Sequence, residues 1–118
     1  MDRNDPESVV RRYYDLVDAE RYDDLVALFA EDVRYERPGQ EPIEGRDALR
    51  AFYEEDRPLD DGSHEVHDVV VDGETVAVRG AFSGRQDGER VAFGFADVHE
   101  FDGGSIACRH TFTDRDEV

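Results

Sequence analysis

The sequence predicts a single α+β domain in which an antiparallel sheet carries helices on one of its faces. In the first half of the chain, apolar residues recur every three or four positions, which is the period of a helix. In the second half they alternate with polar residues, and Asp-Gly or Gly-Gly pairs separate the alternating runs. Helical segments followed by consecutive strands are typical of an α+β domain. We expect this one domain to span residues 1–118.

Three segments have helical signals. Asp5 is suited to cap the first helix, because Pro6 follows it at the first helical position. The apolar positions of this helix form one stripe, namely Val9, Val10, Tyr13, Leu16 and Val17. A second helix is expected at 22–30, and a third begins after Gly45 and ends before Pro58.

The other segments are predicted to be strands. A short strand is expected at 33–37, where Pro38 and Gly39 end it. Four further strands follow at 64–72, 74–83, 90–101 and 105–113. The short turns between them include Asp-Gly pairs at 72–73 and 87–88, which favour hairpins.

Alternation within the strands predicts which side chains face the helices, because successive side chains point to opposite faces. Strand 74–83 turns inward Val76, Val78 and Phe82. The inward set of strand 90–101 is Val91, Phe93, Phe95, Asp97, His99 and Phe101, with His99 expected at the rim. The inward set of strand 105–113 is Ile106, Cys108, His110 and Phe112, and the outward set is Arg109, Thr111 and Thr113. The faces of His64 and His67 stay open, because both sides of their strand carry polar residues.

Four polar side chains thus fall on apolar faces: Tyr13, Arg37, Asp97 and His110. Burying such groups costs free energy unless they are paired or their pKa values shift. Several of them aimed at one region indicate a concave pocket with convergent polar groups. A structural role stays open for each: an ordinary core tyrosine or histidine, a strand end for Arg37, or a structural pairing of Asp97 with Arg37 or a histidine.

The chain is strongly acidic, with 31 acidic against 14 basic residues and a net charge of -17. Every basic residue is Arg, and the acids are spread along the whole chain. At molar salt the Debye length falls to about 3 Å, which screens this self-repulsion. We therefore expect a cytoplasmic protein from a salt-accumulating halophile, with an acidic partner-binding surface as the alternative. Nucleic-acid binding is disfavoured, because no basic patch exists. No apolar run approaches the length of a membrane span.

Several motifs resemble those of the NTF2-like superfamily, in particular SnoaL-like and ketosteroid-isomerase-like proteins. They are Val9-Val10-Arg11-Arg12-Tyr13, the run Leu28-Phe29-Ala30-Glu31-Asp32, Glu36-Arg37-Pro38 and Ala96-Asp97-Val98-His99. The resemblance covers nearly the whole chain. It implies the cone-shaped NTF2-like (cystatin-like) fold, a curved antiparallel sheet with three helices on its concave side. It also implies a homodimer through the outer face of the sheet.

The resemblance assigns roles by position. Tyr13 matches the tyrosine of the isomerase oxyanion hole, and Asp97 matches its protonated aspartate. The catalytic base should stand before Pro38, but Arg37 occupies that place and cannot accept a proton. Classical steroid isomerisation is therefore not expected. Arg37 suits the binding of an anionic or carbonyl-bearing ligand, and either Asp97 or His110 would move the proton.

We thus expect a SnoaL-like pocket protein for a small apolar or carbonyl-bearing compound. As an enzyme it would perform acid–base isomerisation, cyclisation or hydration and dehydration, with no cofactor and no metal. The expected pocket walls, besides Arg37, are Tyr35, Phe52, Phe82, Phe93 and Phe112. Two alternatives stay open, a non-catalytic ligand-binding domain and a protein-interaction domain of the same fold. The substrate is not identified by the sequence.

Overall fold

The computed structural model describes residues 5–37, 40–56, 59–86 and 88–114, and it has the predicted α+β architecture. The helices are α1 (Pro6–Asp18), α2 (Tyr22–Val26) and α3 (Arg46–Ala51), and α3 continues into a π-helical segment, Phe52–Asp56. The strands are β1 (Phe29–Glu36), β2 (Ile43–Glu44), β3 (Leu59–Asp72), β4 (Thr75–Gln86), β5 (Glu89–Asp102) and β6 (Ser105–Thr113). They form one six-stranded sheet in the order β2-β1-β6-β5-β4-β3. Some residues that the sequence analysis placed at the end of a strand or helix, or in a turn, lie outside the described residues: Pro38, Gly39, Pro58 and Asp87.

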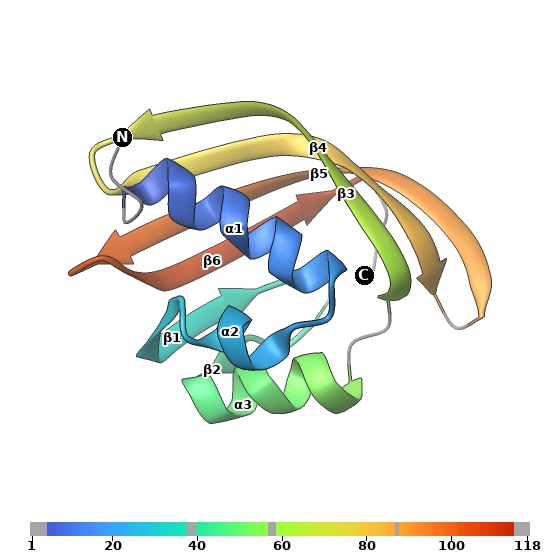
Figure 1. The fold of residues 1–118 in the computed structure, drawn as a ribbon, viewed down its shortest axis with the longest axis horizontal. Helices are drawn as coiled ribbons and strands as arrows, with labels where there is room; N and C mark the ends of the chain where they lie inside the picture. The colour runs from blue at the N-terminus through green and yellow to red at the C-terminus, as the bar shows by residue number, and fades with distance from the viewer. Residues whose placement is uncertain (1–4, 38–39, 57–58, 87, 115–118) are drawn as a thin grey trace.

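Helix α1 follows the prediction closely. The backbone N–H of Ser8 donates to Asp5 Oδ1 at 2.7 Å, so Asp5 caps the helix. The predicted stripe is buried, and Tyr14 is buried beside it with only 3% of its surface exposed. In Figure 1, α1 lies under the curved sheet, which places the buried stripe against the concave face. No helix in the described part of the chain is long and apolar enough to cross a membrane.

The second helix is shorter than predicted, because its apolar end belongs to the sheet. α2 stops at Val26, and β1 begins at Phe29. Phe29 is fully buried and pairs with Ile106 of β6, while the N–H of Ile106 donates to the carbonyl of Leu28 at 2.9 Å. Pairing with a distant strand therefore overrides the local helical pattern in this segment.

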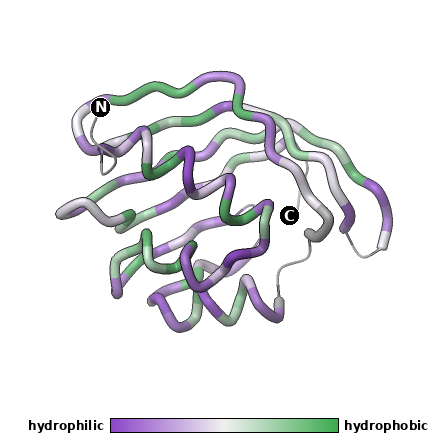
Figure 2. The backbone as a smooth tube through the Cα atoms, in the orientation of Figure 1, coloured by the Kyte–Doolittle hydropathy of each residue, from purple (hydrophilic) through white to green (hydrophobic). Residues whose placement is uncertain are grey.

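The sheet is mixed rather than wholly antiparallel. The long strands β3, β4, β5 and β6 pair in antiparallel hairpins, as predicted. β1, however, runs parallel to β6, and the unpredicted two-residue β2 pairs with β1. Gly73 and Gly103 adopt positive φ angles of 61° in the turns, a conformation that favours glycine. Figure 2 shows hydrophobic and hydrophilic residues interspersed along these strands, and the buried hydrophobic residues form one core cluster.

A bulge in β6 reverses the predicted faces of that strand. Phe101 of β5 pairs with Ile106, but Glu100 pairs with Cys108, so Ala107 is an extra residue. Because one extra residue flips the following side chains, Arg109 and Thr111 point inward and are buried. The prediction that His110 and Phe112 face inward is wrong: His110 is half-buried on the outer face and Phe112 is 49% exposed. Their rings stack on each other with centroids 4.2 Å apart.

Candidate functional site

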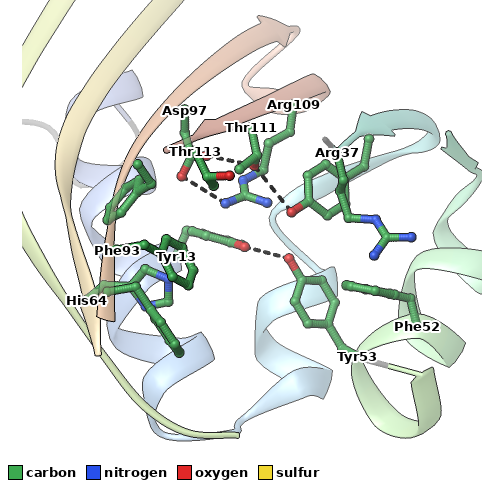
Figure 3. A pocket seen from close by; sticks show the side chains of 13 residues that line it. Tyr13, Arg37, Phe52, Tyr53, His64, Phe93, Asp97, Arg109, Thr111 and Thr113 are labelled. Atoms are coloured by element: carbon green, nitrogen blue, oxygen red, sulfur yellow. Dashed lines mark hydrogen bonds and ion pairs between the residues drawn. The ribbon is translucent and has the colours of Figure 1, made fainter. Parts of the chain in front are cut away.

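A pocket opens between the concave face of the sheet, α1 and the π-helical segment. Its cavity volume is about 40 Å³. The pocket is therefore a narrow slot that suits a small ligand. Its walls combine aromatic rings with a few polar groups: Tyr13, Tyr35, Arg37, Phe52, Tyr53, His64, Phe82, Phe93, Phe95, Asp97, Arg109, Thr111 and Thr113. Figure 3 shows these side chains converging from the strands and both helical segments.

A buried ion pair forms the polar wall of the pocket. Arg109 Nη2 donates to Asp97 Oδ2 at 2.8 Å, and the two side chains are 4% and 1% exposed. Thr111 Oγ1 donates to Asp97 Oδ1 at 2.7 Å, and the hydroxyl of Tyr14 donates to Oδ2 at 2.5 Å. Both oxygens of the carboxylate are thus occupied by donors, which satisfies a buried charge.

Burial by itself raises the pKa of the Asp97 carboxyl, but the opposing effects are larger. The positive charge of Arg109, followed by His99 and the hydrogen bonds from Tyr14 and Thr111, lowers the pKa below its ordinary value. Asp97 is consequently ionised at neutral pH. Its role here is to hold the Arg109 guanidinium in place.

His99 continues this network behind the pocket. Its Nε2 lies 3.2 Å from the Tyr14 hydroxyl, whose proton already goes to Asp97, so Nε2–H is the donor. The ring is fully buried rather than at the predicted rim. Burial, with a further contribution from Arg109, lowers the His99 pKa to about 3, against the opposite effect of Asp97. His99 is therefore neutral at physiological pH.

The Arg109 guanidinium lines the pocket and has donors without a partner among the described residues. Its Nε and Nη1 are buried and have no hydrogen-bond partner in the part of the chain that the structure describes. The guanidinium carbon lies 4.5 Å from the ring centroids of both Tyr13 and Tyr35, so the cation packs against both rings. A cation fixed in this way can offer N–H groups to an oxygen atom in the pocket.

Two tyrosine hydroxyls add a second polar group to the pocket. The Tyr13 and Tyr53 oxygens are 2.5 Å apart and buried. Burial is the main cause that raises the pKa of the Tyr13 hydroxyl well above its ordinary value, so it keeps its proton. Either hydroxyl can be the donor of this hydrogen bond.

His64 and Arg37 lie at opposite ends of the pocket in the view of Figure 3. His64 Nδ1 is 2.6 Å from Asp18 Oδ1, and the His64 side chain is 9% exposed. The guanidinium carbon of Arg37 lies 4.3 Å from the centroid of the Phe52 ring. The described residues contain no group of three or more His, Cys, Asp or Glu side chains that could hold a metal ion.

Comparison with known proteins assigns this architecture to a family. A family model described as the SnoaL-like domain matches residues 10–109. The chain belongs to the SnoaL-like domain family. No curated protein matches the chain.

Solved structures share the fold of this SnoaL-like domain at low sequence identity. An NTF2-like protein of unknown function from Burkholderia pseudomallei has 21% identity and a TM-score of 0.86, covering 97% of this chain and 92% of that one. The epoxide hydrolase/cyclase-like enzyme SalBIII, of pyran ring formation in salinomycin, has 24% identity and a TM-score of 0.81, covering 95% and 92%. An LEH-like epoxide hydrolase from M. tuberculosis has 22% identity and a TM-score of 0.80, covering 90% and 80%.

The SnoaL-like domain brings together most of the residues that the sequence singled out. The predicted residues that line its pocket are Tyr13, Tyr35, Arg37, Phe52, Phe82, Phe93 and Asp97. His110 and Phe112 are not among the lining residues, because the bulge turns them outward. The guanidinium that pairs with Asp97 is that of Arg109, whereas the sequence left open a structural pairing with Arg37 or a histidine.

Sequence reasoning missed several polar groups of the SnoaL-like domain. Tyr14 was overlooked because the predicted stripe passed through Tyr13, although the spacing of Val10, Tyr14 and Val17 is also helical. Arg109 and Thr111 gave no local signal, because strict alternation put them outside. The structure also places the two histidines whose faces the sequence left open. His64 lines the pocket, whereas His67 is exposed and its Nε2 lies 3.5 Å from Glu65 Oε1.

Proposed function

We propose that this SnoaL-like domain binds a small, mostly apolar compound through a carbonyl oxygen and catalyses proton transfer on it without a cofactor. The observation that supports this most is the buried Arg109 guanidinium, with Nε and Nη1 unpaired by the described residues at the wall of an aromatic pocket. Buried donors without partners cost free energy, and a ligand oxygen would remove that cost.

The rest of the pocket suits an apolar body. Aromatic rings from strands β4 and β5 and from the segment after α3 make up much of the wall, namely Phe52, Phe82, Phe93 and Phe95. A pocket with a few polar groups among apolar walls is typical of small-molecule sites. The ligand would place its oxygen at Arg109 and its hydrocarbon part against these rings.

Arg109 would also favour the reaction itself. When a proton leaves the carbon next to a carbonyl group, negative charge develops on the carbonyl oxygen. A fixed cation in a largely buried site stabilises that charge, as an oxyanion hole does. Isomerisation, cyclisation and loss of water next to a carbonyl group can all pass through such an intermediate. The pair of Tyr13 and Tyr53 hydroxyls would add a further polar group to the site.

Asp97 would position Arg109 rather than act as the base. Its two oxygens accept from Tyr14, Thr111 and Arg109, and its lowered pKa makes it a weak proton acceptor. This role differs from the two catalytic roles that the sequence left open for Asp97, those of oxyanion donor and base, and it is closer to the ion pair that was the structural alternative. Another residue of the pocket would therefore transfer the proton.

A binding comparison tests the proposal. Cyclohexanone and methylenecyclohexane have nearly the same shape, but only the ketone has an oxygen. We expect NMR titration of the wild-type protein to give at least about tenfold tighter binding of the ketone, as expected for one charge-assisted hydrogen bond. Equal affinities would refute oxygen recognition by Arg109. Arg79→Gln, which changes an exposed outer-face arginine paired with Asp68, should leave both affinities unchanged.

A non-catalytic binder is the second candidate, and it would bind the ketone without exchanging its protons. Deuterium uptake into cyclohexanone in heavy water separates the two, because catalysed uptake requires proton abstraction.

An interaction domain has less support. Among the described residues, the large hydrophobic side chains that are exposed are Val70, Val71 and Phe112, and the pocket is not filled.

The homodimer stays a proposal. The outer face of the sheet carries Phe112 and His110, where alternation had placed Thr111 and Arg109. This exchange makes the face less polar than predicted, which favours self-association. Sedimentation equilibrium of the wild type and of Phe112→Ser tests it: the wild type should dimerise more tightly, and a monomeric wild type would refute the proposal.

A further inference from the structure

We infer that His64 is the group that takes and returns the proton in this pocket, and that Asp18 positions its ring. The inference rests on the proposed function. It adds a pair of residues, contributed by the end of α1 and by β3, that the sequence did not assign to the site.

The geometry of the pair fixes the orientation of the imidazole. Asp18, the last residue of α1, accepts two hydrogen bonds from one residue: its Oδ2 lies 2.8 Å from the backbone nitrogen of His64, and its Oδ1 lies 2.6 Å from Nδ1. An ionised carboxylate can only accept, so Nδ1 carries the proton. In the neutral ring, Nε2 then has a free lone pair. This is the arrangement in which a carboxylate orients a histidine for general base catalysis.

The imidazole is held on the apolar side of the pocket. Its ring centroid is 4.9 Å from that of Phe82, 5.4 Å from that of Phe95 and 5.3 Å from that of Tyr14. In the described part of the chain, the His64 ring has no hydrogen bond other than the one to Asp18. Its Nε2 is therefore available to a molecule in the pocket that His64 helps to line.

Tyr14 connects the base to the oxygen-binding wall. Its ring contacts His64, and its hydroxyl donates to Asp97, which holds Arg109. A small ketone with its oxygen at Arg109 would thus have its carbon atoms near the His64 end. The predicted alternatives fit less well, because Asp97 has both oxygens occupied and His110 lies on the outer face. Among the described lining residues, His64 is the one imidazole.

The proposed proton transfer needs no reactant other than the ketone and the protein. His64 Nε2 takes a proton from the carbon next to the carbonyl group, and the two electrons of that C–H bond form the carbon–carbon double bond of an enolate. The carbonyl π electrons move to the oxygen, which accepts hydrogen bonds from the N–H groups of Arg109. Returning the proton to the same carbon restores the ketone, and in heavy water the returned hydrogen is a deuteron.

Deuterium uptake into cyclohexanone, followed by proton NMR, measures this step. We expect His64→Gln to slow the uptake about 100-fold or more, while ketone binding stays within about threefold of the wild type. Added imidazole should restore part of the rate in His64→Ala, because the truncated side chain leaves room for it. The matched control is His67→Gln, which changes an exposed histidine on the same strand and should exchange at the wild-type rate.

A spectroscopic measurement tests the positioning role of Asp18 independently of activity. Long-range proton–nitrogen NMR of histidine-labelled protein reports which ring nitrogen of neutral His64 carries hydrogen. The wild type should show the Nδ1–H form. Asp18→Asn can present its amide N–H to Nδ1, so the Nε2–H form should grow and the uptake rate should fall with it.

The outcomes separate this inference from the proposed function. If the ketone binds no better than its hydrocarbon analogue, the proposed function is wrong, and the assignment of His64 as base fails with it. If the ketone binds well but deuterium uptake is absent, the catalytic part of the proposed function is refuted together with the assignment of His64. If uptake proceeds unchanged in a folded His64→Gln protein, only the assignment of His64 is overturned. A wild-type spectrum with His64 in the Nε2–H form would also overturn it.

Discussion

Asp97 on β5 and Arg109 on β6 form a buried ion pair whose N–O distance is 2.8 Å. The strands that carry them are neighbours in the sheet, and the bulge at Ala107 is what turns Arg109 to the same side as Asp97. Two charges taken out of water are stable together only when their other atoms are satisfied. Asp97 meets this condition fully, whereas Arg109 has two buried nitrogens, Nε and Nη1, without a partner among the described residues.

Breaking this pair should destabilise the domain strongly. Asp97→Asn keeps the shape of the side chain but leaves the Arg109 charge buried without a counter-charge. We expect the free energy of unfolding to fall by about 3–5 kcal/mol, measured by urea denaturation. Asp68→Asn removes the partner of the exposed Arg79 and should cost no more than about 1 kcal/mol. Similar losses in the two variants would mean that the Asp97 pair is not buried in solution.

Acidification should destabilise the domain through His99. The unfolded chain takes up a proton at this residue near the ordinary pKa of 6.5, whereas the folded protein does so only near about 3. The unfolded state therefore binds more protons between these values, and stability falls as the pH is lowered through this window. From pH 7 to pH 5, His99 should account for a loss of about 2 kcal/mol.

The comparison of urea denaturation at the two pH values isolates this contribution. His99→Gln should remove it from the pH dependence, whatever its effect on stability at pH 7. His67→Gln, which changes an exposed histidine, should retain it. If His99→Gln has the same pH dependence as the wild type, the claim of a buried neutral His99 is wrong.

Tyr14, rather than Tyr13, should be coupled to Asp97. Tyr14→Phe removes one donor to the carboxylate, and Thr111→Val removes another. Each should cost about 1–3 kcal/mol, and the double variant should deviate from additivity by at least about 0.5 kcal/mol. Tyr13→Phe acts on the Tyr53 pair, so its cycle with Thr111→Val should be closer to additive. If the unfolding free energies showed stronger coupling of Thr111 to Tyr13 than to Tyr14, the assigned contacts would be contradicted.

Because His110 points outward, its substitution should have little effect on stability or binding. The ring is half-exposed, stacks on Phe112 and lies 3.5 Å from Glu36. His110→Gln should change the free energy of unfolding by no more than about 0.5 kcal/mol, as is usual at surface sites. It should also leave ketone binding unchanged. A loss of several kcal/mol would favour the inward orientation that unbroken alternation predicts.

The acidic composition predicts a dependence on salt. With a net charge of -17, the folded chain repels itself at low ionic strength, and added KCl screens that repulsion. The melting temperature should therefore rise steadily as KCl is increased toward molar concentrations. A melting temperature that is independent of KCl would remove the argument for adaptation to high salt.

Alternation predicted the site well where the strands pair without interruption. β4 and β5 stay in one register from the pair Thr75 and Glu100 to the pair Gln86 and Glu89, so the inward set from Phe93 to Phe101 was predicted correctly. β6 contains an extra residue at Ala107, and every inward assignment after it was reversed. A bulge depends on the partner strand, and neither Ala107 nor its neighbours carry a local signal for it.

Long-range pairing explains the other differences between sequence and structure. Phe29 belongs to an apolar run that is compatible with a helix end, and only its pairing with β6 makes it part of a strand. His64 could not be given a face because its strand has polar residues on both sides. Its place in the pocket depends on Asp18, a residue 46 positions earlier, which accepts from its backbone and its ring.

The most direct test of oxygen recognition is the NMR signal of the Arg109 Nε–H during a cyclohexanone titration. Because Nε is buried at the pocket wall and unpaired by the described residues, its proton should shift progressively and saturate together with the binding curve. Methylenecyclohexane at equal occupancy should move it much less. An Arg109 Nε–H signal that stays fixed while the ketone binds would contradict the account.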